Sequence, residues 1–318
     1  MFLKLKKIIS LLALFPKFKP RIFFHLISKA SEPLPNIAKL KNQWGSFSGL
    51  ENDAAFQFIK AQGINEKHFE ELAHLLIKKD WNVVDLGANI GSHSILLSRL
   101  VSEGKVFSFE PQSLTFSLLQ NNLLLNLCEN VFAYKFAISD TELKTVSMEV
   151  FSYSGAKTIR IANGTYINNG AVSISQNATA GDLTISKRLD DLDLPPIKFI
   201  KIDIQGSEVG ALNGAKKTIA RYRPTMFIEI EELRLRSLGT SSKELIELLL
   251  EYNYVLFRIK TNYPCDHICV PQEKVDEFSL SILKKFNYEC ERIEGKKVKL
   301  FFRSMSDQNY EKIEIIKH

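Results

Sequence analysis

The sequence has no uninterrupted apolar run long enough to span a bilayer, and it contains no internal repeat and no low-complexity linker. Because a transmembrane helix needs about 20 consecutive apolar residues, a conventional membrane span is excluded. Hydrophobic residues make up 45% of the 318 residues, which excludes wholesale disorder and a collagen-like or coiled-coil architecture. At roughly 100–200 residues per domain, we expect one large domain with decorations or two small ones.

Acidic residues are absent from positions 1–30, which carry seven lysine and arginine residues. The other 288 residues hold 35 basic and 36 acidic residues, so this segment is the source of the formal net charge of +6. Such a balance argues against a nucleic-acid-binding surface spread over the fold. No small-residue cleavage pattern follows the apolar stretch at 8–15, so a cleaved signal peptide is not expected.

Two interpretations of residues 1–30 remain open. Lysine and arginine interleaved with phenylalanine, leucine and isoleucine suit a helix that lies on anionic lipid. The same pattern suits a leading helix that packs on the body of the protein. We therefore expect an uncleaved cytoplasmic protein, either free or peripheral at the cytoplasmic face of the membrane, and the oligomeric state stays open.

Cysteine is scarce, with four residues in the chain. Cys265 and Cys269 lie on either side of His267, but a structural zinc site needs four ligands in tightly spaced pairs, and no second pair is present. We predict reduced thiols and no metal site.

Short apolar runs alternate with helical patterns from residue 82 onward. This alternation predicts βαβ units, a mostly parallel sheet flanked by helices, and a ligand site beyond the carboxyl ends of the strands. The predicted strands cover 82–86, 105–109, 131–138, 197–202, 225–230, 254–259 and 297–302, and the predicted helices cover 92–101, 114–127, 207–220 and 242–252.

Two regions are expected to decorate this domain, which we place at 81–318. Residues 31–80 are predicted to form a helical N-terminal cap. Residues 143–186 are rich in serine, threonine, asparagine and glycine and predict an inserted β-hairpin subdomain. The insertion either shapes a substrate site or decorates the surface, because long loops serve both purposes.

The strongest local motif is DLGANIG, from Asp85 to Gly91, at a predicted strand-to-helix turn. Its two glycines let the backbone approach a ligand closely. A dinucleotide-binding turn has the different spacing GxGxxG and holds a pyrophosphate. The negative charge of Asp85 would repel a pyrophosphate and favour a cationic ligand. S-adenosylmethionine (SAM), with an ammonium, a sulfonium and no phosphate, is therefore preferred to NAD.

Glu110 ends the second predicted strand and strengthens this interpretation. A carboxylate there can accept hydrogen bonds from both ribose hydroxyls of a nucleoside, as in dinucleotide-binding folds. Alternatively, Glu110 is an acid that favours the start of a helix before Pro111.

Six motifs in order, within about residues 80–232, resemble the FkbM family of SAM-dependent methyltransferases: VVDLGANIGSHS, FSFEP, NNLLLN, AISD, KIDIQGSE and PTMFIEI. The resemblance implies the class I methyltransferase fold, an α/β Rossmann-like sheet of seven strands in which one strand near the C-terminal end is antiparallel. It also implies O-methylation of a hydroxyl, often on a sugar or polyketide.

The resemblance further assigns the cofactor contacts. The methionine end of SAM would be held by Asp85, Gly87, Asn89 and Gly91, and the ribose by Glu110. The adenine would be lined by Ala137, Ile138 and Ser139.

A general base within reach of the acceptor is expected, because an alcohol is a poor nucleophile. Asp203, at the tip of the fourth predicted strand, is the favoured base, although it could instead cap the next helix. His93, Glu208 and Glu229 are further candidates, and a buried Lys201–Glu229 pair is a structural alternative. Gln205 stands where the family commonly has an acid, which disfavours a metal-assisted or two-carboxylate mechanism.

The sequence thus predicts a SAM-dependent O-methyltransferase acting on a glycan, sugar or similar hydroxyl acceptor. Two alternatives remain. The chain could be a non-catalytic, membrane-associated binding module of a glycan-assembly complex, as the departure at Gln205 suggests. It could also be a nucleotide-sugar or NAD enzyme, against which the charge of Asp85 argues.

Overall fold

The computed structural model describes residues 36–318, except positions 65, 142, 149–157, 162–163, 168–173, 176–181, 262, 264, 294–296, 304–309 and 317–318. The basic segment 1–30 lies outside the described residues. Among those that are described, no helix has the length and apolar character needed to cross a membrane.

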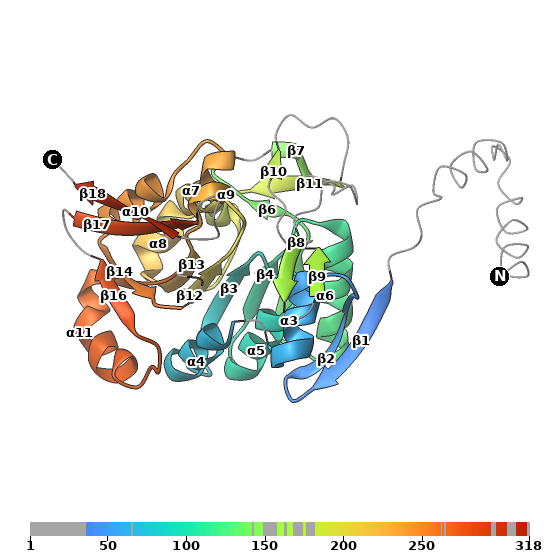
Figure 1. The fold of residues 1–318 in the computed structure, drawn as a ribbon. Coiled ribbons are helices and arrows are strands. Elements are labelled where there is room, and N and C mark those ends of the chain that lie inside the picture. The colour runs from blue at the N-terminus through green and yellow to red at the C-terminus, as the bar shows by residue number, and fades with distance from the viewer. Residues whose placement is uncertain are drawn as a thin grey trace, which may run out of the picture. The chain divides into compact units, whose positions relative to one another are not determined.

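An eight-stranded sheet forms the centre of the body, in the order β16-β14-β15-β13-β12-β3-β4-β5 (Figure 1). The five strands from β5 to β13 are parallel, whereas β15 is antiparallel to both of its neighbours and β16 is antiparallel to β14. The predicted Rossmann-like, mostly parallel sheet is therefore confirmed. The strands are β3 (Asn82–Leu86), β4 (Val106–Phe109), β5 (Val131–Tyr134), β12 (Ile197–Ile202), β13 (Thr225–Glu229), β14 (Tyr254–Ile259), β15 (Asp266–Pro271) and β16 (Cys290–Ile293).

Two expectations about this sheet are corrected. It has eight strands instead of seven, because β16 extends the edge beyond β14. The antiparallel strand inside the sheet is β15, which was not predicted, whereas the predicted strand at 297–302 is β17 (Lys297–Arg303) and pairs with β18 (Tyr310–Ile316) in a separate two-stranded sheet. The sequence pattern did not predict β15, because a strand that is buried throughout begins here with two polar residues, Asp266 and His267.

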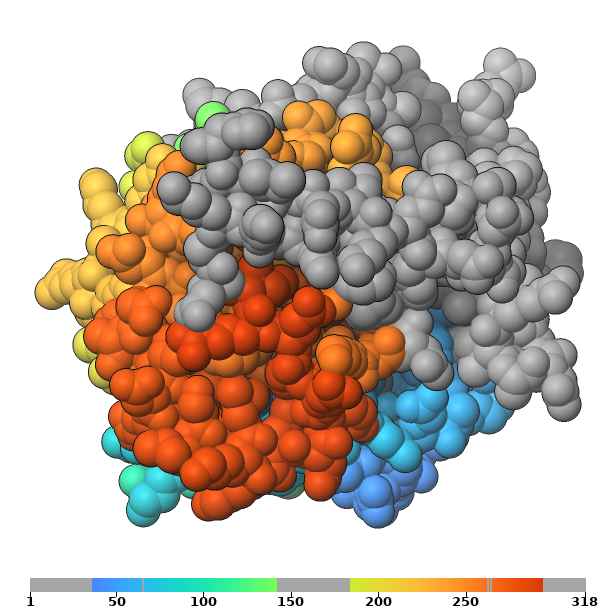
Figure 2. Space-filling view, turned by 60° about the vertical axis from the view of Figure 1, so that its left-hand side comes forward, coloured from blue at the N-terminus to red at the C-terminus, as the bar shows by residue number. Residues whose placement is uncertain are grey.

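Helices cover both faces of the sheet. On one face, α4 (Lys67–Leu76), α5 (Ser92–Leu100) and α11 (Val275–Phe278) pack on strand residues such as Phe199 and Phe227. On the other face, α7 (Glu208–Asn213), α8 (Lys216–Tyr222) and α10 (Ser242–Glu251) pack on residues such as Ile200. In Figure 2 the late part of the described chain, coloured orange to red, forms a continuous area of the surface on the side that faces the viewer. Shorter helical turns are α9 (Glu232–Ser237), η1 (Leu189–Asp191), η2 (Gln272–Lys274) and η3 (Ser279–Leu283).

The N-terminal part of the described chain is not the all-helical cap that was expected. An antiparallel hairpin of β1 (Ile37–Asn42) and β2 (Gly45–Leu50) precedes α3 (Ala54–Gln62) and α4. The side chains of β1 alternate between exposed and half-buried, and this period of two, with lysines outward, is typical of a half-buried strand.

Strands also fill the described parts of the inserted region. β6 (Ala137–Ile138), β7 (Leu143–Met148), β10 (Ile174–Ser175) and β11 (Asp182–Lys187) form a four-stranded sheet, and β8 (Thr158–Ile161) pairs with β9 (Gly164–Ile167) as an antiparallel hairpin. The predicted β-rich insertion is therefore present.

The side chain of Asn122 joins three parts of the fold. It lies on α6 (Ser113–Leu125), is fully buried, accepts from Ser48 N at 2.6 Å, and donates to Ser48 O at 2.9 Å and to Ile90 O at 2.8 Å. It thus fastens β2 and the turn before α5 to the same helix.

Replacing Asn122 by alanine leaves these buried backbone groups unpaired. We expect Asn122→Ala to lower the free energy of unfolding by about 2–4 kcal/mol, since each unsatisfied buried group costs roughly 1–3 kcal/mol. Urea denaturation followed by circular dichroism measures this loss. Gln120→Ala, at an exposed position of the same helix, is the matched control and should change stability by less than about 0.5 kcal/mol. Equal losses for the two variants would contradict the prediction.

Candidate functional site

The turn between β3 and α5 lies at the carboxyl edge of the sheet and has a tightly constrained backbone. Gly87 and Gly91 have positive φ angles of 79° and 92°. A Cβ atom at Gly87 would lie 1.8 Å from the carbonyl oxygen of Asp203, so only glycine fits there. Asn89 also has a left-handed backbone, with φ of 51°, and its Oδ1 accepts from Ile90 N. The close approach at Gly87 is therefore to the loop after β12.

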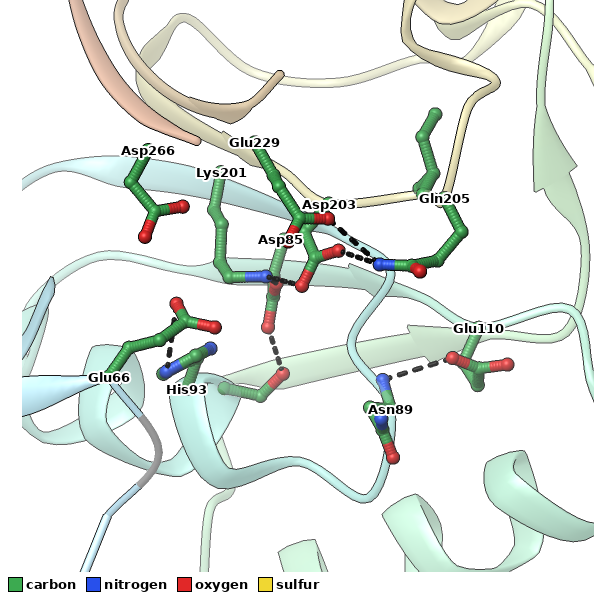
Figure 3. A network of polar contacts seen from close by, with 12 residues as sticks. Glu66, Asp85, Asn89, His93, Glu110, Lys201, Asp203, Gln205, Glu229 and Asp266 are labelled. Carbon is green, nitrogen blue, oxygen red and sulfur yellow. Dashed lines mark hydrogen bonds and ion pairs between the residues drawn. The ribbon is translucent and has the colours of Figure 1, made fainter. Parts of the chain in front are cut away.

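Asp85 does not project from the strand tip. It lies within β3 and is completely buried, with Ser94 Oγ donating to its Oδ2 at 2.6 Å and Lys201 Nζ 4.0 Å from its Oδ1 (Figure 3). Burial raises the pKa of the Asp85 carboxyl. The expectation that this charge itself faces a cationic ligand is corrected, because an internal lysine compensates it.

Glu110 follows β4 and ties that strand to the glycine turn. Its Oε2 accepts from Asn89 N at 3.0 Å (Figure 3), and its Oε1 accepts from Gln112 N at 2.9 Å. Burial raises the pKa of Glu110 to about 7, although the two backbone hydrogen bonds act in the opposite direction. Each carboxylate oxygen can accept a second hydrogen bond, so the residue fits the predicted role as an acceptor for hydroxyls.

The segment 137–139 lies further along the same edge. Ala137 and Ile138 form β6 beside β11, and their side chains are buried. Ser139 N donates to Lys187 O at 2.9 Å, and a Cβ atom at Gly214 would lie 2.0 Å from Ser139 O. The structure thus leaves the half-buried Ser139, rather than the two buried side chains, as the part of this segment that a ligand can contact.

Lys201 is a buried cation between two carboxylates. Its Nζ lies 3.2 Å from Asp203 Oδ2 and 4.0 Å from Asp85 Oδ1 (Figure 3). Burial alone lowers the pKa of Lys201, but the attraction of Asp203 and Asp85 outweighs burial and raises it. The expected Lys201–Glu229 pair is therefore replaced by pairing with these two aspartates.

Gln205 bridges two carboxyl groups at the end of β12 and β13. Its Nε2 donates to Asp203 Oδ1 at 2.7 Å and to Glu229 Oε2 at 2.9 Å (Figure 3), from a backbone with a positive φ of 56°. Sequence reasoning took this glutamine as a sign against a two-carboxylate arrangement. The structure corrects that expectation, because the amide holds Asp203 and Glu229 side by side.

The two carboxyl groups of this pair differ in their protonation. Burial raises the pKa of Asp203, but Lys201 and the hydrogen bonds from Glu229 and Gln205 outweigh burial, and the pKa falls below its usual value. Burial and the charge of Asp203 raise the pKa of Glu229 well above its usual value. The opposite directions of these shifts favour a neutral Glu229 beside an ionised Asp203, whose side chain is partly accessible.

Glu208 braces the loop that carries Gln205. Its Oε1 accepts from Ile204 N at 3.2 Å and from Gly206 N at 3.1 Å, and burial raises its pKa to about 7. The structure thus explains Glu208 by loop positioning, which differs from the predicted place among the proton acceptors.

His93, a further candidate base, is buried in the first turn of α5. Its ring lies 4.5 Å from that of Phe69, and its Nε2 lies 3.8 Å from Glu66 Oε2 (Figure 3). Burial and the charge of Asp266 raise the pKa of Glu66 to about 8. Sequence reasoning missed Glu66, because it lies outside every motif and in the segment predicted as a helical cap.

Asp266 was also not predicted as a site residue, because its neighbours Cys265 and Cys269 were considered only as possible metal ligands. His68 Nε2 lies 2.7 Å from Asp266 Oδ2, so α4 and β15 meet through this contact. Both cysteines are free and buried. Within the described ranges, no three histidine, cysteine, aspartate or glutamate side chains are placed to hold a metal ion.

Comparison with known proteins points to one family. A model of the methyltransferase FkbM domain matches residues 85–256, more than half of the chain. Methyltransferase 1 of Beauveria bassiana is 26% identical over 145 residues, which are 42% of this chain and 57% of that protein. Methyltransferase sdnD of Sordaria araneosa is 27% identical over 184 residues, 50% of this chain and 71% of that protein. The chain thus spans little more than half the length of the Beauveria protein.

Solved structures were compared as well. The methyltransferase FkbM from Methylobacillus flagellatus aligns with a TM-score of 0.41 and 19% identity, covering 69% of this chain and 48% of that one.

Gln205→Glu replaces both bridging N–H donors by oxygen and adds a third carboxyl group beside Asp203 and Glu229. We expect the free energy of unfolding to fall by about 2–4 kcal/mol at pH 8, since hydrogen bonds to charged groups contribute roughly 1.5–3 kcal/mol each. The loss should shrink at pH 6, because protonation relieves the repulsion among carboxylates. Urea unfolding at the two pH values measures this difference. Gln205→Ala removes the donors without adding charge, so its loss should not depend on pH, and a pH-independent loss for both variants would contradict the prediction.

Proposed function

Because this chain belongs to the methyltransferase FkbM family, we propose that it transfers a methyl group from SAM to a hydroxyl of a glycan, sugar or similar acceptor. The observation that carries the proposal is the carboxyl pair of Asp203 and Glu229, bridged by Gln205 at the carboxyl edge of the sheet. This edge is where parallel α/β sheets bind their ligands.

The residues at this edge fit a cationic nucleoside. Glu110 offers carboxylate oxygens to ribose hydroxyls, and its hydrogen bond from Asn89 N places it beside the glycine turn. Asp203, ionised and partly accessible, supplies the negative charge that the sequence had placed on Asp85. That charge favours SAM over a dinucleotide, whose diphosphate it would repel.

SAM supplies an electrophilic methyl group when it is bound, and the protein supplies alignment and a proton acceptor. A hydroxyl acceptor held beside Asp203 would lose its proton to that carboxylate as it takes up the methyl group that SAM would supply. A weak base is sufficient, because an oxygen that gains a third bond becomes strongly acidic. The low pKa of Asp203 is therefore compatible with the role.

The alternative of a non-catalytic binding module loses its main support. The departure at Gln205 suggested a vestigial site in a binding module, yet its amide makes a short hydrogen bond to each carboxyl group. A glycan or sugar acceptor remains our proposal from the family resemblance.

Peripheral association of residues 1–30 with anionic membranes at the cytoplasmic face is proposed from the basic and apolar residues interleaved in that segment.

Methyl transfer is tested with the full chain, methyl-labelled SAM and glycan extracts or small polyhydroxyl acceptors. Asp203→Asn removes the proton acceptor, and we expect kcat to fall by about 10²–10⁴-fold. Asp276→Asn, at an exposed position on α11, is the matched control and should keep full activity. Label that never leaves SAM, or an Asp203→Asn variant as active as the control, would refute the proposal.

Binding of SAM should depend on pH through Glu110. Its carboxyl group is mostly protonated at pH 6 and mostly ionised at pH 8, and the ionised form accepts hydroxyl hydrogen bonds better. We expect Kd to fall by up to about tenfold between these values. Isothermal titration calorimetry of the wild type and of Glu110→Gln measures the effect, and the variant should lose this part of the pH dependence. Identical pH profiles would exclude Glu110 from the binding site.

A further inference from the structure

One side of the body carries an unusual group of exposed leucines. Eight large hydrophobic side chains are exposed among the described residues, and four of them belong to α6 and the turn that follows it. Leu124 is 75% exposed and Leu127 is 80% exposed. We call the four together the α6 leucine surface: Leu114, Leu124, Leu125 and Leu127.

The core does not need these side chains. The inner side of α6 packs through Leu118, Leu119 and Leu123, which are buried against α3 and α5. Polar residues on the outer side would leave that packing unchanged, so the α6 leucine surface calls for an explanation outside the folded core.

Leu127 adds a second, independent observation. It lies two residues after the end of α6 and has a positive φ of 54°, and Cys128 N donates to Leu123 O at 3.0 Å across this turn. Glycine or asparagine is favoured at this left-handed position, because a side chain strains the backbone there. The sequence thus keeps a large apolar side chain where both exposure and backbone conformation oppose it.

The strand pair that contacts the end of α6 carries basic side chains, although acidic Glu129 lies close to Leu127 in the sequence. Asn126, in the turn after α6, exchanges two hydrogen bonds with Ser46 of β2, and β1 pairs with β2 (Figure 1). The exposed residues of β1 are Ile37, Lys39 and Lys41. The chain that precedes Ile37 begins with 30 residues that carry seven bases and no acid.

We propose that the α6 leucine surface, together with the outward face of β1, docks on an anionic lipid bilayer, where residues 1–30 add electrostatic attraction. Leucines beside lysines suit the boundary between acyl chains and acidic headgroups. A second copy of the chain fits less well, because four leucines are few for a stable interface of about 1,200–2,000 Å² and the basic segments would repel each other.

Vesicle co-sedimentation of the full chain tests the proposal, with phosphatidylcholine vesicles that contain or lack phosphatidylglycerol. We expect binding to the anionic vesicles, and at least a tenfold weaker partition for the double variant Leu124→Ser/Leu127→Ser. Leu280→Ser is the matched control. It changes a leucine that is 62% exposed but lies in η3, away from α6 in the sequence, and it should bind like the wild type.

Leu127→Gly separates docking from folding. It relieves the left-handed backbone, so its Tm should rise by about 2 °C or more, while its vesicle binding should weaken. Methyl transfer to a soluble acceptor should be unchanged in every leucine variant, which keeps this test distinct from that of the proposed function.

Three outcomes would overturn the proposal. The first is wild-type vesicle binding by the double variant, which would leave the basic segment as the sole lipid contact. The second is no binding by the wild type. The third is a dimer in sedimentation equilibrium that the double variant dissociates without any lipid binding, which would assign the surface to a second copy of the chain.

Discussion

The buried ammonium group of Lys201 is the interaction on which the polar edge of the sheet depends. Two carboxylates inside a protein remain ionised only if a charge or hydrogen bonds compensate them. Lys201 lies within 4.0 Å of both Asp85 and Asp203, and it keeps Asp203 ionised although the group is largely withdrawn from water. Asp203 in turn raises the pKa of Glu229, and Gln205 can then bridge one charged and one neutral carboxyl group.

The site is a direct continuation of the hydrophobic core. Side chains two residues apart on a strand share a face, and on β12 this face passes from buried Phe199 to Lys201 and then to Asp203. On β13 it passes from Phe227 to Glu229. The apolar side chains that pack under α4 and α5 are thus followed along each strand by charged side chains. The packing of the aromatic residues therefore fixes the positions of these charged groups at the edge of the sheet.

Local patterns predicted what depends on neighbours in the sequence. The strands at 82–86, 197–202 and 254–259 were predicted with their observed bounds, because each is a short apolar run with clear ends. Glu110 and Asp203 were predicted from their places at strand ends. The inward direction of Asp85 and the contribution of Glu66 were not predictable, since each depends on a partner more than 25 residues away, Lys201 for one and His93 for the other.

Several buried carboxyl groups lie close together around Lys201, and shifts of their pKa values limit the repulsion among them. Burial raises the pKa of Glu66 to about 8 and that of Glu229 well above its usual value, which favours the neutral form of both groups, and Lys201 offsets part of the charge of Asp85 and Asp203. A cation bound beside Asp203 would favour the ionised forms and so lower both pKa values. Binding of a positively charged ligand should therefore release protons and strengthen as the pH rises through these pKa values. The raised pKa values of Glu66 and Glu229 thus limit the unpaired buried charge at this edge, and proton release on binding of a cation would make the edge more negative.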